Sequence, residues 1–160
     1  MYRENVPSAD VHQFAFCLER FGYSTVVLEV DSAGVTAQSR PRQIVIGVLA
    51  STGVCPAEVF SELARGARGD AALGQVEQAQ QTRAVCLTAR FKQFSCLDNF
   101  VSEPGRGIRV LTAIERARLQ GFPDDWLAGF SEDRAATLYG NAVTVPVFRQ
   151  VAERIMKVAL

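Results

Sequence analysis

The sequence is poor in the residues that build metal and redox centres. It contains a single histidine, His12, and its four cysteines show no C-x-x-C spacing (Cys17, Cys55, Cys86 and Cys96). One histidine argues against a histidine-based metal site or catalytic triad, and the cysteine spacing argues against a zinc site or a small disulfide scaffold. We therefore expect no metal site, and reduced thiols that are mostly buried.

Long apolar runs and a net charge are missing as well. No segment approaches the roughly 18 consecutive apolar residues that cross a bilayer, and the first residues lack the apolar core of a secretory signal. These absences predict a cytoplasmic protein without a membrane partner. Seventeen basic residues balance seventeen acidic ones, so the net charge predicts nothing about a polyanionic partner. Residues 83–118 carry a local excess of positive charge, with seven basic residues against three acidic ones.

A chain of 160 residues, 48% of them hydrophobic, is long enough for one domain with a packed core. Two β-rich runs, at residues 25–30 and 43–50, are so apolar that they predict strands covered on both faces. Two strands cannot provide that cover, so we expect an incomplete sheet. The terminal helix has an apolar face, which we expect to lie uncovered as a large hydrophobic patch, formed by Val147, Val151, Ile155 and Val158.

The stretch RVLTAIERARLQGFP, at residues 109–123, predicts a capped helix. Thr112 and Glu115 form the T-x-x-E pattern of a capping box, in which each residue satisfies a backbone N–H of the other. Gly121 favours the end of the helix, and Pro123 prevents its continuation. Further along, the dipeptide Gly140-Asn141 predicts a turn before the terminal helix.

This capped helix and the segment GNAVTVPV, at residues 140–147, resemble the last two signature blocks of the cytosine-C5 DNA methyltransferases. The blocks read R-x-L-T-x-x-E-x-x-R-L-Q-G-F-P and G-N-(A/S)-V-x-x-P-V, and every specified position is present. Upstream, ENVP at residues 4–7 resembles the family's E-N-V block, and QSRPR at residues 38–42 resembles its Q-x-R-x-R block. Four blocks therefore occur in the order that the family has.

The resemblance implies an α/β fold. It would be the C-terminal part of a Rossmann-like methyltransferase sheet, joined to a small irregular β target-recognition subdomain. Residues 1–55 are then a partial catalytic domain with a helix, two strands and the arginine loop, which carries Arg40 and Arg42. Residues 56–82 are a helix and a linker. Residues 83–108 are a partial target-recognition region. Residues 109–160 contain the helix that supports recognition, the closing G-N-A-V block and the terminal helix.

Two parts of the family's pattern are missing. The family has an N-terminal cofactor-binding block and takes its nucleophile from a Pro-Cys dipeptide, and this sequence contains neither. The resemblance thus implies the C-terminal half of a DNA (cytosine-5)-methyltransferase of a bacterial or phage restriction-modification system, inactive without a complementary N-terminal half. Two alternatives stay open: a truncated, inactive remnant of a gene or prophage, or a DNA-binding protein without catalysis.

In this family a thiolate adds to C6 of cytosine, so that C5 attacks the methyl group of S-adenosyl-L-methionine. By resemblance, Glu4 is the partner of cytosine N3, and Arg42 lies near O2 with Arg40 beside it. The carboxyl donates a proton where charge develops, and the guanidinium stays charged. The base reaches them only after rotation out of the duplex. The resemblance also implies a cofactor wall, complete only with the other half, at Asn141, Ala142 and Val143.

Double-stranded DNA is the implied partner of the recognition region. The candidates for groove or phosphate contacts are Arg90, Lys92, Gln93, Arg106 and Arg109. Arginine and lysine bind both phosphates and guanine, so the type of side chain does not identify the base that it contacts. The target sequence is therefore not predicted.

Overall fold

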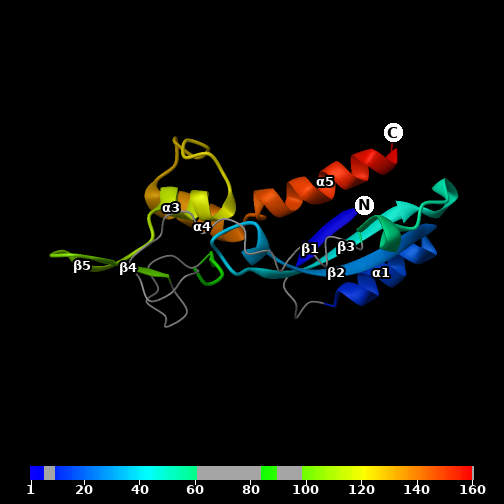
Figure 1. The fold of residues 1–160 in the computed structure, drawn as a ribbon, viewed down its shortest axis with the longest axis horizontal. Helices are drawn as coiled ribbons and strands as arrows, with labels where there is room; N and C mark the ends of the chain where they lie inside the picture. Colours follow the sequence, from blue (N-terminus) through cyan, green and yellow to red (C-terminus); the bar gives the residue numbers. More distant parts are fainter. Residues whose placement is uncertain (6–9, 61–83, 90–98, 160) are drawn as a thin grey trace.

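Three strands form an antiparallel sheet in the computed structural model (Figure 1), which describes residues 1–5, 10–60, 84–89 and 99–159. Their order is β1-β3-β2, and their bounds are β1 (Tyr2–Asn5), β2 (Tyr23–Asp31) and β3 (Pro41–Leu49). The two apolar runs of the sequence are thus confirmed as strands. The segment with the E-N-V motif adds the third strand, in which Glu4 lies opposite Ile44 of β3.

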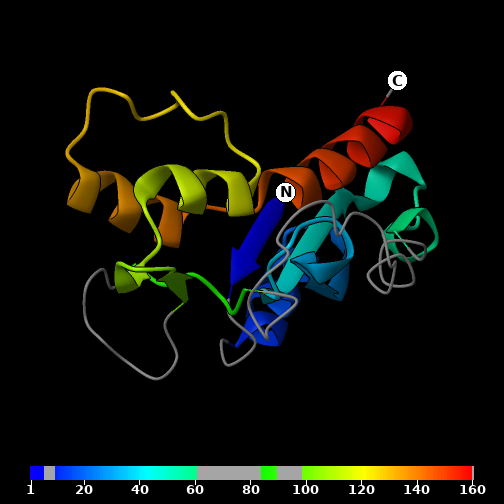
Figure 2. The same cartoon turned by 60° about the vertical axis from the view of Figure 1, so that its left-hand side comes forward.

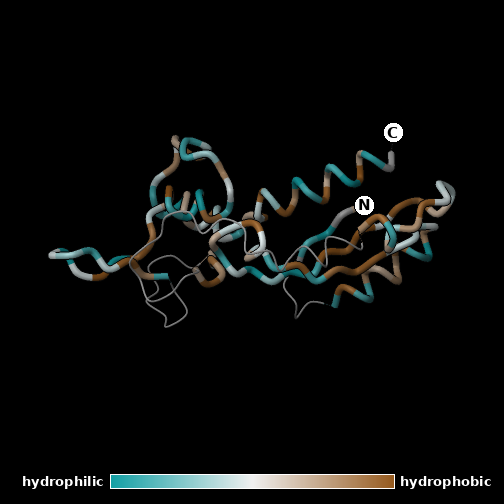
Figure 3. Tube along the Cα trace, viewed as in Figure 1, coloured by the Kyte–Doolittle hydropathy of each residue, from teal (hydrophilic) through white to brown (hydrophobic). Residues whose placement is uncertain are grey.

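Helices cover both faces of β3, which confirms the prediction of two-sided burial. Ile44, Val45 and Ile46 follow one another and are each at most 1% exposed. Because successive side chains of a strand point to opposite faces, Val45 packs against α1 (Val11–Arg20), whereas Ile44 and Ile46 pack with residues of α5 (Val145–Ala159). Figure 2 shows the two helices on opposite sides of the sheet, and Figure 3 shows hydrophobic residues concentrated along the strands.

The prediction that the terminal helix lacks a cover is wrong. Val147 and Val151 of α5 are buried in a cluster with aliphatic residues of β2 and β3, and Ile155 packs against the same cluster. The reason is that α5 packs along one face of the sheet, so that the sheet covers the apolar face of the helix. Phe148 and Met156 stay exposed on the other side of the helix.

The described thiols are free, but the prediction that they are mostly buried is wrong for two of them. Cys17 lies exposed on α1 and Cys55 is exposed after β3, while Cys86 is half-buried. Cys96 lies outside the described residues. Within the described ranges, no three His, Cys, Asp or Glu side chains gather as a metal site would require. No helix among these residues is long and apolar enough to cross a membrane.

A hairpin and two helices form the other end of the molecule (Figure 1). The hairpin consists of β4 (Phe100–Glu103) and β5 (Gly107–Val110), and the helices are α3 (Ala113–Gln120) and α4 (Glu132–Asn141). The capping box of α3 is confirmed. Its Thr112 Oγ1 accepts the Glu115 N–H at 3.2 Å, and the Glu115 carboxylate accepts the Thr112 N–H at 2.7 Å. Gly121 follows the helix with a φ of +79°.

Helix α4 replaces the turn that the sequence predicts at Gly140-Asn141. The helix runs through both residues, and the chain leaves it at Ala142, so the predicted turn is wrong. The glycine is needed for a different reason. A Cβ atom on Gly140 would overlap the backbone carbonyl of Thr88. Gly140 therefore allows residues 84–89 to lie directly against α4.

Candidate functional site

Strand pairing brings an acidic and a basic side chain together at one end of the sheet. Glu4 of β1 lies opposite Ile44, and Arg42 is two residues before Ile44 on the same face of β3. Arg42 Nε lies 3.6 Å from Glu4 Oε1, and the two side chains are only 14% and 13% exposed. Shielding from solvent strengthens the attraction between the two charges.

The loop between β2 and β3 is folded around Asp31. One carboxylate oxygen of Asp31 accepts the backbone N–H groups of Ala33 at 3.0 Å and Arg40 at 2.7 Å. The other oxygen accepts the Ser39 hydroxyl at 2.8 Å. These bonds fix the backbone from which Arg40 and Arg42 extend.

Arg40 is buried, and its guanidinium binds backbone carbonyls. Nη1 donates to Leu87 O at 2.7 Å, and Nη2 donates to Gly140 O at 3.2 Å and Ala142 O at 2.9 Å. Burial is the main cause that lowers the pKa of Arg40, and repulsion from Arg42 is the second. In this structure Arg40 joins three segments, while Arg42 is the arginine that faces Glu4.

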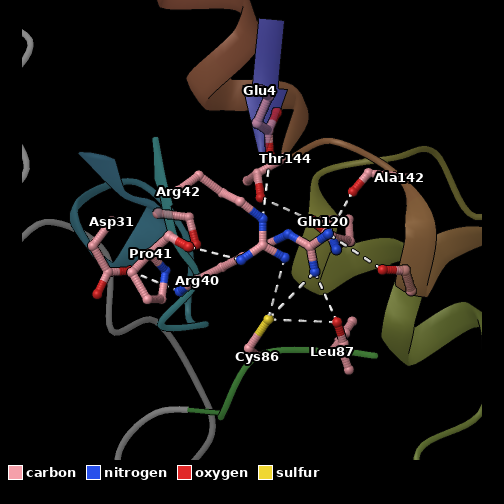
Figure 4. A network of polar contacts seen from close by, with 12 residues as sticks. Glu4, Asp31, Arg40, Pro41, Arg42, Cys86, Leu87, Gln120, Ala142 and Thr144 are labelled. Carbon is pink, nitrogen blue, oxygen red and sulfur yellow. Dashed lines mark hydrogen bonds and ion pairs between the residues drawn. The ribbon is translucent and has the colours of Figure 1, made fainter. Parts of the chain in front are cut away.

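Cys86 lies against the guanidinium groups of both arginines (Figure 4). Its Sγ accepts hydrogen bonds from Arg40 Nη1 and Arg42 Nη2, both at 3.5 Å. The thiol also donates to Leu87 O at 3.5 Å. The sulfur is thus part of one polar network with the predicted catalytic residues.

A small cavity adjoins the Glu4–Arg42 pair. Its volume is about 10 Å³, and Ser32 and Thr144 lie in its wall with the two charged residues. The buried Thr144 donates its hydroxyl hydrogen to Gln120 Oε1 at 2.9 Å, which ties the wall to α3. Such a volume holds about one water molecule, so a pyrimidine ring does not fit inside it.

The predicted cofactor residues lie beside this network. Asn141 is exposed, whereas Ala142 and Val143 are half-buried, and the Ala142 carbonyl is already bound by Arg40. The cavity next to Thr144 is far too small for S-adenosylmethionine. This cavity therefore does not by itself fit the cofactor.

The residues predicted to contact DNA lie in different surroundings. Arg106 is exposed at the tip of the β4–β5 hairpin. Arg109 instead binds two carboxylates, with Nε 2.6 Å from Glu103 and Nη1 2.8 Å from Glu115. Hydrogen bonds from Arg109 lower the pKa of Glu115 to about 2, and bonds to the two carboxylates raise the pKa of Arg109. The remaining candidates lie outside the described residues: Arg90, Lys92 and Gln93.

Sequence reasoning missed Cys86 and Thr144. Thr144 occupies an unspecified position of the G-N-A-V-x-x-P-V pattern, so the motif gives it no weight. Cys86 carries no signal of its own, because its neighbours in the network are distant in sequence. Gln38 has a clearer signal as the first residue of Q-x-R-x-R, and its Oε1 accepts the Leu87 N–H at 3.1 Å.

A family model for C-5 cytosine-specific DNA methylases matches residues 64–157, more than half of the chain. The chain belongs to this family. Type II methyltransferase M.NlaX of Neisseria lactamica is 47% identical over 60 residues, or 38% of this chain and 19% of that protein. Type II methyltransferase M.HpaII of Haemophilus parainfluenzae is 36% identical over 76 residues, or 47% of this chain and 21% of that protein. The matches span about a fifth of these curated relatives.

Solved methyltransferases share the fold of this C5 methylase chain. The S. pombe Dnmt2 methyltransferase matches with a TM-score of 0.74 and 16% identity, over 98% of this chain and 64% of its own. The Entamoeba histolytica methyltransferase EhMeth matches with a TM-score of 0.67 and 15% identity, over 98% of this chain and 62% of its own. These matches confirm the predicted α/β methyltransferase fold.

Proposed function

We propose that this chain is the cytosine-binding and target-recognition part of an S-adenosylmethionine-dependent DNA (cytosine-5)-methyltransferase. Membership of the C5 family supports the reaction class. The observation that carries the proposal is the shielded pair of Glu4 and Arg42. A carboxyl group and a guanidinium at this spacing match N3 and O2, two neighbouring polar positions on the edge of a cytosine.

In this proposal Glu4 and Arg42 bind a cytosine that has rotated out of the duplex. Attack of a thiol on C6 moves electron density onto N3 and O2 of the base. Once the base has separated Glu4 from Arg42, the Glu4 carboxylate takes up a proton from solvent and donates it in a hydrogen bond to N3, while Arg42 donates to O2 and remains charged. Because the two side chains now face each other, the base must separate the ion pair.

The nucleophile is proposed to come from a methyltransferase part outside these 160 residues, on the same or another polypeptide. The sequence has no Pro-Cys dipeptide, and Cys86 follows a valine. That other part would also supply most of the cofactor site, with Asn141, Ala142 and Val143 as one edge. Bound S-adenosylmethionine provides the methyl group. Within the described residues β1 pairs only with β3, so its other edge is available for a further strand.

The test combines this chain with an N-terminal C5 methyltransferase part that carries the cofactor strand and Pro-Cys. Methyl transfer to duplex DNA should appear only in the mixture. Glu4→Gln should slow transfer by about two orders of magnitude or more and leave DNA affinity nearly unchanged, because it removes a positioned proton donor. Glu29→Gln, at an exposed carboxylate of β2, is the matched control and should transfer at the wild-type rate.

Transfer by Glu4→Gln at the wild-type rate would show that the Glu4 assignment is wrong. Tight DNA binding without transfer in any mixture would favour a DNA-binding protein without catalysis. A chain that neither binds DNA nor supports transfer would be an inactive remnant.

A further inference from the structure

We propose that Cys86 is a positioning residue that holds the Arg42 guanidinium toward the cytosine. This role rests on the proposed function for the identity of the bound base. The described contacts of Arg42 involve all three of its guanidinium nitrogens. Nη1 donates to Pro41 O at 2.7 Å, Nη2 donates to Cys86 Sγ at 3.5 Å, and Nε lies 3.6 Å from Glu4. In Figure 4 the guanidinium lies between Glu4 and Cys86.

In the proposed complex, the contact of Arg42 with Glu4 is the one that cytosine replaces. When Glu4 turns to N3 of the base, Arg42 keeps the Pro41 carbonyl and the Cys86 sulfur. The Pro41 carbonyl belongs to the preceding residue, so it restrains the side chain locally. Cys86 is 44 residues away in sequence, and it is the contact that fixes the guanidinium relative to the rest of the site.

The sulfur is itself held in place. Its S–H donates to Leu87 O, which leaves the sulfur lone pairs for the guanidinium groups of Arg40 and Arg42. The backbone around it is tied to the arginine loop, because Gln38 Oε1 accepts the Leu87 N–H and Ala84 O accepts the Ser39 N–H at 2.9 Å. Cys86 is therefore a fixed acceptor rather than a mobile surface thiol.

The segment that contains Cys86 is also bonded to the start of the β4–β5 hairpin. Asn99, directly before β4, accepts the Val85 N–H at 2.8 Å and donates to Val85 O at 3.0 Å. Val85 directly precedes Cys86, so the backbone next to the sulfur is also bonded to the residue before β4. These bonds restrain the position of the sulfur further.

The first test observes Arg42 by ¹⁵N NMR of the guanidinium groups in the 160-residue chain. In the wild type the two Nη signals of Arg42 should be separate at low temperature, because bonds to Pro41 and Cys86 slow rotation of the guanidinium. They should merge in Cys86→Ala and separate again in Cys86→Ser, which restores an acceptor. Arg109, held by two carboxylates, reports in every variant that the chain is folded.

Arg42 signals that stay separate in a folded Cys86→Ala chain would overturn the proposal. If the Arg109 signals show that Cys86→Ala does not fold, the experiment is repeated with Cys86→Val, because valine fills the space without offering an acceptor. The same merging of the Arg42 signals is then expected, and its absence is equally decisive.

The second test measures methyl transfer with the complementary N-terminal part. Cys86→Ala should lower kcat roughly ten- to a hundredfold with little change in KM for DNA, because a misaligned guanidinium stabilises the reacting base less well. Cys86→Ser should recover most of the rate. Equal kcat for the wild type and Cys86→Ala overturns the positioning role. A wild-type mixture without transfer contradicts the proposed function instead, and the NMR result then decides the Cys86 contact independently.

Discussion

The two ends of the molecule are held together by different kinds of contact. The sheet end, made of β1, β2, β3, α1 and α5, buries large aliphatic and aromatic side chains such as Ile44 and Phe60. The hairpin end, made of β4, β5, α3 and α4, has a core of four alanines and Tyr139. It relies on charged groups as well, since Arg109 joins β5 to α3 through Glu115. Apolar burial depends little on pH, whereas ion pairs respond to pH and salt.

The largest effect on stability is expected from a substitution that creates a cavity in the core of the sheet end. Ile44 is fully buried, so Ile44→Ala should lower the free energy of unfolding by about 2–5 kcal/mol. Ile114→Ala on α3 is the matched control, because Ile114 is 47% exposed and should change stability by less than about 0.5 kcal/mol. Urea denaturation of both variants measures the difference. Similar losses for the two would contradict the described core.

The Arg109–Glu115 pair should make the hairpin end sensitive to acid. The pKa of Glu115 falls from 4.5 to about 2 on folding, so its contribution is present above pH 4.5 and is lost as the pH falls toward 2. Glu115→Gln keeps a residue suited to the capping box but removes the charge. At pH 6 we expect a loss of about 1 kcal/mol, since the pair is partly solvated.

Denaturation at pH 6 and pH 2.5 tests the role of Glu115. The difference between wild type and Glu115→Gln should shrink at the lower pH, and 1 M salt at pH 6 should also reduce it. A difference that is the same under all three conditions would mean that the charge does not stabilise this end.

The smallest effect on stability is expected at the hairpin tip. Arg106→Ala should change the free energy of unfolding by less than about 0.5 kcal/mol, because the side chain is exposed. If Arg106 contacts a phosphate, the slope of log affinity for duplex DNA against log salt should flatten by about 0.9. Arg20→Ala, at an exposed arginine of α1, is the control and should leave the slope unchanged. An unaltered slope for Arg106→Ala would exclude the tip as a phosphate contact.

Local patterns account for the elements that the sequence predicted correctly. The capping box of α3 needs only Thr112 and Glu115, and two-sided apolar runs identify β2 and β3. Strand β1 has only four residues and owes its place to pairing with β3, which the residues of β1 alone do not indicate. Helix α4 was missed because three of its four buried positions, Ala135, Ala136 and Gly140, have small side chains that give little hydrophobic signal.

The residues of the site also fall into those that local motifs predict and those that depend on contacts between distant segments. The E-N-V and Q-x-R-x-R motifs predicted that Glu4 and Arg42 belong to one site, and the structure brings their side chains together. The partners of Cys86 and Arg109, and the packing reason for Gly140, depend on contacts between segments that no local pattern describes. The roles of Glu4, Arg42 and Arg106 in the reaction stay predictions that the experiments above address.

Arg40 connects residues that are made at different times during synthesis. Its guanidinium donates to the carbonyls of Gly140 and Ala142, which follow it by 100 and 102 residues. Until residues 140–142 have been synthesised, these acceptors do not exist, and burial of an unpaired guanidinium is costly. We therefore expect the arginine loop to stay solvated on the nascent chain, and the surroundings of Glu4 and Arg42 to close only after residue 142 has emerged.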